Sequence, residues 1–116
     1  MNELSNQYSV ELKSLEKGIY TDVIKQIIKD FQLVGLTPTW KEIDKPDVFW
    51  MEFIQVINEL LLNEPEKVRA LLYRVDLDES VLNTLVESTA IDKIAEFSRQ
   101  ILIRETQKVM SRLKNR

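Results

Sequence analysis

The stretch DVFWMEFIQVINELLL, residues 47–62, is the most apolar part of the 116-residue chain and decides its fold. Successive residues of a helix lie about 100° apart, so the apolar side chains of this stretch cover about 160° of a helical wheel. The remainder of the wheel is polar and holds Glu52, Gln55, Asn58 and Glu59. A helix that is apolar over nearly half of its circumference contacts several neighbours. The pattern therefore predicts a central helix over about 47–62.

The segments on both sides of this stretch also repeat apolar residues at intervals of three and four. The segment from Ile91 to about Lys114 carries apolar residues along one side and predicts a long C-terminal helix. The apolar arcs of residues 4–19 and 20–34 lie on different sides of one wheel. This difference predicts two helices with a break or bend at Gly18–Thr21.

Glycine, proline and capping residues mark the expected helix boundaries. Gly35 suits the left-handed residue that ends a helix, and Pro46 and Pro65 suit the first helical position. Thr39 and Glu42 fit a capping box, which predicts a single helical turn over residues 40–43. Residues 76–79 hold a second capping signature and predict the start of a short helix.

These patterns together predict an all-α fold. We expect a compact bundle of five to seven short helices that forms one domain over residues 1–116. The composition agrees with this expectation, because two Gly and three Pro are too few for a turn-rich β fold. Hydrophobic residues make up 44% of the chain and charged residues 30%, enough to form a core and keep a polar surface.

The composition also removes the commonest catalytic and metal-binding side chains. The chain has no cysteine and no histidine, which excludes thiol catalysis and zinc sites built on cysteine and leaves no imidazole base. Acid–base chemistry would depend on carboxylate pairs such as Glu52 with Glu59 or Asp76 with Asp78, for which surface charge is the simpler explanation. We therefore predict that the protein is not an enzyme and has no catalytic, cofactor-binding or metal-binding residues.

One acid falls within an expected apolar face. Glu105 lies in the apolar arc of the last helix, and we expect it to form an ion pair with Arg112 or Arg99. Such a paired acid is structural rather than catalytic.

Residues 76–87 partly match a calcium-binding loop. An EF-hand takes oxygen ligands from loop positions one, three, five and twelve. Here these positions hold Asp76, Asp78, Ser80 and Glu87. Position six needs glycine for a sharp turn, whereas this chain has Val81. Helix capping explains the same acids, so calcium binding is only an alternative function.

The chain is bipolar in charge. Residues 59–98 hold nine acids and four bases, a net charge of −5, whereas residues 99–116 hold six bases and one acid, a net charge of +5. Arg104, Lys108 and Arg112 are the expected charged contacts. Nucleic-acid binding by this basic helix is an alternative function, but its bases are spread around the helix and no aromatic residue stands among them to stack on a base. A solvated helix end that packs on the protein's own acidic helices explains the same charges.

Five apolar residues lie outside the expected core. Met51 and Leu62 fall toward the polar side of the central helix, and Phe97 and Ile103 fall off the apolar arc of the last helix. Trp40 lies in a connection, where it either covers the bundle or belongs to an interface. We expect these five residues to form an interface with a protein partner or a second copy.

Neither a signal peptide nor a membrane span is expected. The longest stretch without a charged residue, 31–40, is far shorter than the roughly 20 apolar residues of a spanning helix. Residues 1–14 contain no apolar run. The sequence therefore predicts a cytoplasmic protein with no membrane contact, whose leading function is non-catalytic binding to an unknown protein partner or to itself as a homo-oligomer.

Overall fold

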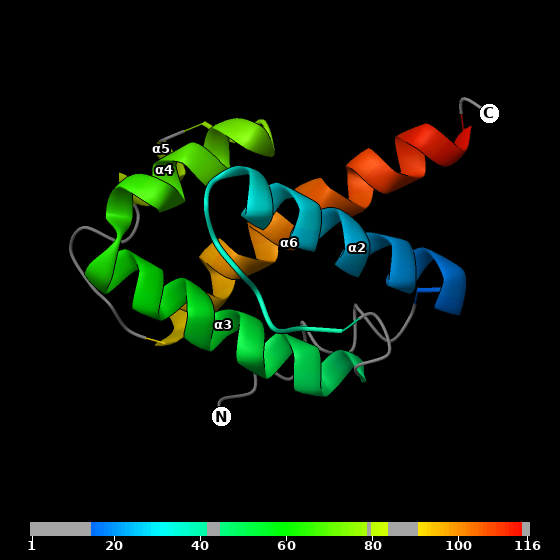
Figure 1. Cartoon of the computed structure of the whole chain (residues 1–116), viewed down its shortest axis with the longest axis horizontal. Helices are drawn as coiled ribbons and strands as arrows, with labels where there is room; N and C mark the ends of the chain where they lie inside the picture. The colour runs from blue at the N-terminus through cyan, green and yellow to red at the C-terminus, as the bar shows by residue number, and fades with distance from the viewer. Residues whose placement is uncertain (1–14, 42–44, 79, 84–90, 115–116) are drawn as a thin grey trace.

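The computed structural model describes residues 15–41, 45–78, 80–83 and 91–114. The helices follow in the order α2 (Lys17–Leu33), α3 (Pro46–Asn63), α4 (Pro65–Arg74), α5 (Ser80–Asn83) and α6 (Ile91–Lys114). No strand occurs among the described residues, which confirms the all-α class (Figure 1). The expected number of five to seven helices is wrong, because α5 is a single turn of four residues and the described part of the chain holds only four longer helices.

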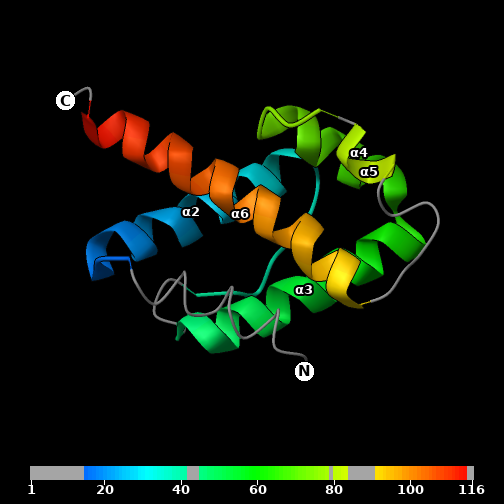
Figure 2. The same cartoon turned by 180° about the vertical axis from the view of Figure 1, so that it is seen from behind.

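Three helices, α2, α3 and α6, form the body of the molecule. In Figure 1, α2 and α3 lie on the near side, and Figure 2 shows from behind that α6 crosses both of them. The shorter α4 closes one end of the bundle, where it packs against α3 and α2. Because α6 contacts two helices, side chains over a wide arc of α6 are buried.

The central helix has the position that the sequence predicts. α3 extends one residue beyond 47–62 at each end, and Pro46 stands in its first turn as expected. The buried residues of α3 are Phe49, Trp50, Phe53, Ile54, Ile57 and Leu60. Although α3 is the most apolar helix, no helix in the described part of the chain combines the length and the apolarity needed to cross a membrane.

Replacing Ile57 by alanine removes a fully buried side chain from the middle of α3. We expect the free energy of unfolding to fall by about 2–4 kcal/mol, because the core closes only partly around the cavity. Urea denaturation followed by circular dichroism measures this loss, with Leu33→Ala, at an exposed apolar residue of α2, as the control. A loss below about 0.5 kcal/mol for Ile57→Ala would mean that the other face of α3 is inside.

The expected break at Gly18–Thr21 is wrong in position, because residues 15–16 are not helical and these four residues lie within α2, while most of the first expected helix, over residues 4–19, lies outside the described residues. α2 begins at Lys17, so Thr21 lies within the helix rather than at its N-cap. Tyr20 is buried, and its ring packs edge to face against Phe49 of α3 with centroids 6.4 Å apart. This contact holds the first turn of α2 on the core, which explains why the glycine does not interrupt the helix despite a cost of about 1 kcal/mol.

Two helices end on a residue with positive φ. Gly35 (φ 85°) follows α2 as expected, and the amide of the next residue donates to the Phe31 carbonyl oxygen at 3.0 Å. Asp76 (φ 63°) follows α4, and the amide after it donates to the Leu72 carbonyl oxygen at 2.8 Å. Aspartate is one of the few residues that tolerate this conformation. The acid at position one of the expected calcium loop therefore serves to end α4.

The connection between α2 and α3 supplies a residue of the core. Trp40 is 4% exposed, and its ring centroid lies 5.1 Å from that of Phe31, 5.4 Å from that of Phe49 and 5.5 Å from that of Phe53. Trp40 and Lys41 are not helical, so the turn expected over 40–43 is wrong for its described part, while residues 42–44 lie outside the described residues. The aromatic contacts hold this segment across the bundle, as a cover over the core.

Candidate functional site

Two carboxyl groups are buried where α2 and α6 meet. Asp30 of α2 and Glu105 of α6 are each 1% exposed, although acids are rarely buried without partners. Lys108 Nζ lies 2.9 Å from Asp30 Oδ2 and 3.7 Å from Glu105 Oε1. Gln26 Nε2 donates to the same Asp30 oxygen at 3.1 Å. We refer to Gln26, Asp30, Glu105 and Lys108 as the buried acid cluster.

The helical register of α2 and α6 explains the cluster. Gln26 and Asp30 are one turn apart, on the face of α2 that also buries Val23 and Ile27. Glu105 lies on the face of α6 that buries Ile101 and Val109, each four residues away. In both helices, polar side chains therefore occupy positions on the face that is otherwise apolar and buried.

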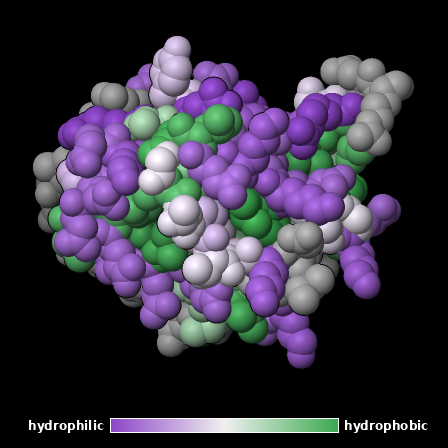
Figure 3. All heavy atoms as spheres, in the orientation of Figure 1, coloured by the Kyte–Doolittle hydropathy of each residue, from purple (hydrophilic) through white to green (hydrophobic). Residues whose placement is uncertain are grey.

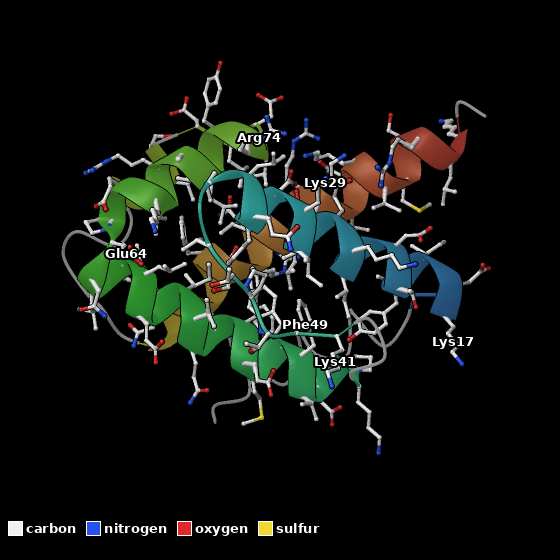
Figure 4. The ribbon with its side chains drawn as sticks, in the orientation of Figure 1. Lys17, Lys29, Lys41, Phe49, Glu64 and Arg74 are labelled. Atoms are coloured by element: carbon white, nitrogen blue, oxygen red, sulfur yellow. The ribbon has the colours of Figure 1, made fainter. Side chains whose placement is uncertain are left out.

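A second cation approaches the cluster from α4. Arg74 Nη2 lies 4.0 Å from Asp30 Oδ1, and Lys108 Nζ donates to the Arg74 carbonyl oxygen at 3.4 Å. Figure 4 shows Arg74 at the edge of the molecule where α4 approaches α2. Asp30 Oδ1 and both Glu105 oxygens have no hydrogen-bond partner within 3.5 Å among the described residues. Two cations therefore lie near Asp30, whereas Glu105 has only a long contact with one of them.

The two acids prefer opposite protonation states. Burial and the neighbouring Asp30 carboxylate raise the pKa of Glu105 from 4.5 to about 8, and the nearby Lys108 opposes this shift. Burial also acts to raise the pKa of Asp30, but the neighbouring Glu105 carboxyl group and the hydrogen bonds from Lys108 and Gln26 outweigh it and lower that pKa below 3.8. At neutral pH the cluster therefore holds one carboxylate, one neutral carboxyl group and one ammonium group.

The buried acid cluster links α2 to α6. Perturbed pKa values also mark catalytic acids, but a general acid must reach the group that it protonates. Neither carboxyl group is exposed to solvent, so a substrate could reach them only if α2 and α6 separated. The acid cluster therefore supports a structural role.

The expected partner of Glu105 is wrong, and the buried Asp30 is not among the expected site residues. Glu105 contacts Lys108, one turn further along α6, and not Arg112 or Arg99. The signal for Asp30 was its place beside Phe31 in the apolar arc of α2. A single acid in such an arc indicates that a cation lies near it in the folded protein. The identity of that cation depends on which helix packs against α2.

The three bases expected to contact a partner have different surroundings. Arg104 Nη2 lies 3.1 Å from Asp76 Oδ2, and Lys108 belongs to the buried acid cluster. Arg112 is exposed beside a groove between α2 and α6. Two of the three charges are thus balanced within the chain.

The five expected interface residues do not share one surface. Trp40 and Phe97 are buried in the core, with Phe97 1% exposed, so neither is available to a partner. Phe97 falls outside the narrow apolar arc of a helix with one neighbour, but it is buried because α6 packs on both α2 and α3. Met51 and Leu62 are exposed by 52% and 67%, and Ile103 is half-buried.

The residues of the expected calcium loop have other roles. Asp76 ends α4 and pairs with Arg104, while Asp78 Oδ1 accepts a hydrogen bond of 2.8 Å from the Ser80 amide at the start of α5. Glu87 lies outside the described residues. Within the described residues, no three acidic side chains come together in a way that could hold a metal ion.

An apolar stripe runs along the solvent side of α3. Val48, Met51 and Leu62 are all strongly exposed, and Gln55 lies between them. Residues 48, 55 and 62 are seven apart, so they stand above one another on the helix. Figure 3 shows hydrophobic residues at the surface between hydrophilic ones. We refer to Val48, Met51, Gln55 and Leu62 as the α3 outer face.

Comparison of the chain with protein-family models, with curated proteins and with solved structures finds no match.

Proposed function

We propose that the protein is a non-catalytic module that associates with a second copy of itself through the α3 outer face. The observation that carries this proposal is the alignment of Val48, Met51 and Leu62 in one exposed stripe. Single exposed apolar residues are common on protein surfaces, but a row of them along one helix is typical of an interface between helices.

The charges around the stripe favour a basic partner surface. Glu52 and Glu59 are exposed on α3 beside the stripe, so two α3 outer faces would repel each other. The solvent side of α6 offers the complement, because Met110 and Lys114 are exposed there next to the half-buried Ile103. We define Ile103, Gln107, Met110 and Lys114 as the α6 outer face. The α3 outer face of one copy then packs on the α6 outer face of the next, which joins copies head to tail.

The alternatives have less support. Arg104 and Lys108, two of the three bases expected to contact nucleic acid, are already engaged in ion pairs within the chain. Asp76 and Asp78, the first two expected calcium ligands, bind a guanidinium group and a backbone amide. The burial of Asp30 and Glu105 supports the non-catalytic part of the proposal.

Complementary variants test the head-to-tail arrangement. Light scattering after size exclusion is expected to give the wild type a mass above 13.7 kDa that rises with concentration. Met51→Glu/Leu62→Glu blocks one face and Met110→Glu/Lys114→Glu blocks the other, so each variant alone is expected to be a monomer. An equimolar mixture retains one intact pair of faces and is expected to contain a dimer of twice 13.7 kDa.

A matched control separates the interface from general surface polarity. Leu33→Glu/Tyr73→Glu also places two acids at exposed apolar residues, away from both faces, and is expected to associate like the wild type. A wild-type protein that stays monomeric at high concentration would refute self-association. A mixture of the two blocked variants that stays monomeric would refute the head-to-tail arrangement.

A further inference from the structure

A groove between α2 and α6 gathers positive charge. Two surface pockets of about 300 and 330 Å³ follow one another along the two helices and share Gln26 and Arg112. Lys25 and Lys29 of α2 line the first pocket, and Arg104 and Lys108 of α6 line the second. We refer to these two pockets together as the basic groove.

Several charges of the basic groove are not balanced within the chain. Lys25, Lys29 and Arg112 are exposed and have no ion-pair partner among the residues that the structure describes. The lining of the two pockets contains a single acid, Asp22. Three cations against one acid leave this surface with an excess of positive charge, even though the whole chain has a net charge of −3.

The register of the helices concentrates this charge. Lys25 and Lys29 are four residues apart on α2, and Arg104, Lys108 and Arg112 repeat at the same interval on α6. Like charges at this spacing repel one another. Asp76 and Asp30 balance Arg104 and Lys108, so ion pairs within the chain account for these two bases. The described residues offer no such pair for Lys25, Lys29 or Arg112, and a bound anion would relieve the repulsion between Lys25 and Lys29.

The donors of the basic groove indicate the chemistry of the anion. Ammonium and guanidinium groups form charge-assisted hydrogen bonds with phosphate oxygens, and the guanidinium group of Arg112 can bind two of them at once. The amides of Gln26 and Gln107 add neutral donors beside these charges. No aromatic side chain lines either pocket, so the groove offers no surface on which a nucleic-acid base could stack.

The spacing of the cations allows several of them to reach one small ligand. Residues four apart on a helix are separated by about 6 Å along its axis, so the long side chains of Lys25 and Lys29 can converge on phosphate groups of one molecule. We propose that the basic groove binds a compact polyphosphate that carries at least two linked phosphate groups. The basic groove shares Gln107 with the α6 outer face, but Met110 and Lys114, the two residues changed in the self-association test, do not line the groove.

Calorimetric titration with inorganic tripolyphosphate tests the proposal. The wild type is expected to bind one tripolyphosphate per chain, with an affinity that falls as salt is added. The triple variant Lys25→Ala/Lys29→Ala/Arg112→Ala is expected to bind at least about tenfold more weakly, because three charge-assisted contacts are lost. Alanine suits exposed helix positions, so this variant is expected to fold, which circular dichroism verifies.

The control variant removes the same residue types elsewhere. Lys45→Ala/Arg69→Ala/Lys93→Ala also deletes two lysines and one arginine from exposed positions, and it leaves the basic groove intact. Its affinity for tripolyphosphate is expected to stay within about twofold of the wild type. An equal loss of affinity in both triple variants would show general charge attraction and would overturn the site.

A second titration separates free polyphosphate from nucleic acid. A short DNA duplex is expected to bind more weakly than tripolyphosphate, because its stiff backbone can place few phosphates in a groove of this size. Binding of the duplex that requires Lys25, Lys29 and Arg112, with none of tripolyphosphate, would overturn the proposal in favour of a nucleic-acid site. The absence of tripolyphosphate binding at low salt would refute it as well.

Discussion

Glu105→Gln is expected to raise the free energy of unfolding by on the order of 5 kcal/mol at pH 9. Each tenfold change in proton affinity corresponds to about 1.4 kcal/mol, and the pKa of Glu105 rises from 4.5 to about 8 on folding. Above pH 8 the wild type must either place a second negative charge beside Asp30 or keep a proton that the unfolded chain releases. Glutamine has nearly the same shape, is neutral at every pH and can donate to the Asp30 carboxylate.

The pH profile follows from the same shifts. Because the folded protein holds the Glu105 proton more tightly than the unfolded chain, the stabilising effect is complete below pH 4.5 and is lost as the pH rises through about 8. The pKa of Asp30 is lowered, so its contribution is lost as the pH falls below 3.8. These two groups alone therefore place the stability maximum near the ordinary pKa values of acidic side chains, well below neutral pH.

Urea denaturation of the wild type and of Glu105→Gln between pH 5 and pH 9 measures this effect. The wild type is expected to lose stability across the range, and the variant to remain nearly constant. Glu59→Gln, a substitution of the same type at an exposed position of α3, is expected to follow the wild type. A wild-type profile that is flat over this range, or a variant less stable than the wild type at pH 9, would contradict a buried neutral Glu105.

The helix boundaries that could be predicted are those that depend on local chemistry. Pro46 and Pro65 begin helices because a first-turn residue needs no amide donor, and Gly35 ends one because it accepts positive φ. The apolar spacing of residues 47–62 also identified the central helix to within one residue at each end. These features require no knowledge of neighbouring helices.

The features that could not be predicted depend on contacts with other helices. Thr21 has a good N-cap side chain, but the contact of Tyr20 with α3 extends the helix past it. Phe97 lies outside the narrow arc of a helix with one neighbour, yet it is buried because α6 has two. Asp30 and Lys108 are 78 residues apart, so no local pattern relates them. Tertiary contacts overrode the local signal at each of these positions.

The number of charges could likewise be predicted from the sequence, whereas their ion pairs could not. The excess of bases after Arg99 is visible in the composition, but the sequence does not show that Arg104 and Lys108 meet acids of the chain while Arg112 does not. It also does not show that Lys25 and Lys29 of α2 join Arg112 along one groove. The candidate binding surface therefore differs from the expected basic helix, because half of it comes from another element.

Trp40→Ala is expected to lower the free energy of unfolding by about 3–5 kcal/mol, more than most single substitutions. The indole ring is almost completely buried and touches Phe31 and Phe53 as well as Phe49, so its removal opens a large cavity among three other rings. The residue lies in a non-helical segment, which means that alanine gains no helix propensity in compensation. Trp40→Phe keeps an aromatic ring and is expected to lose less than half as much, whereas Leu33→Ala, at an exposed apolar residue, is expected to lose under about 0.5 kcal/mol. Urea denaturation measures the free energy of unfolding of all three variants. A loss below about 1 kcal/mol for Trp40→Ala would show that this segment does not cover the core, because removing a side chain that lies on the surface of the free chain changes its stability little.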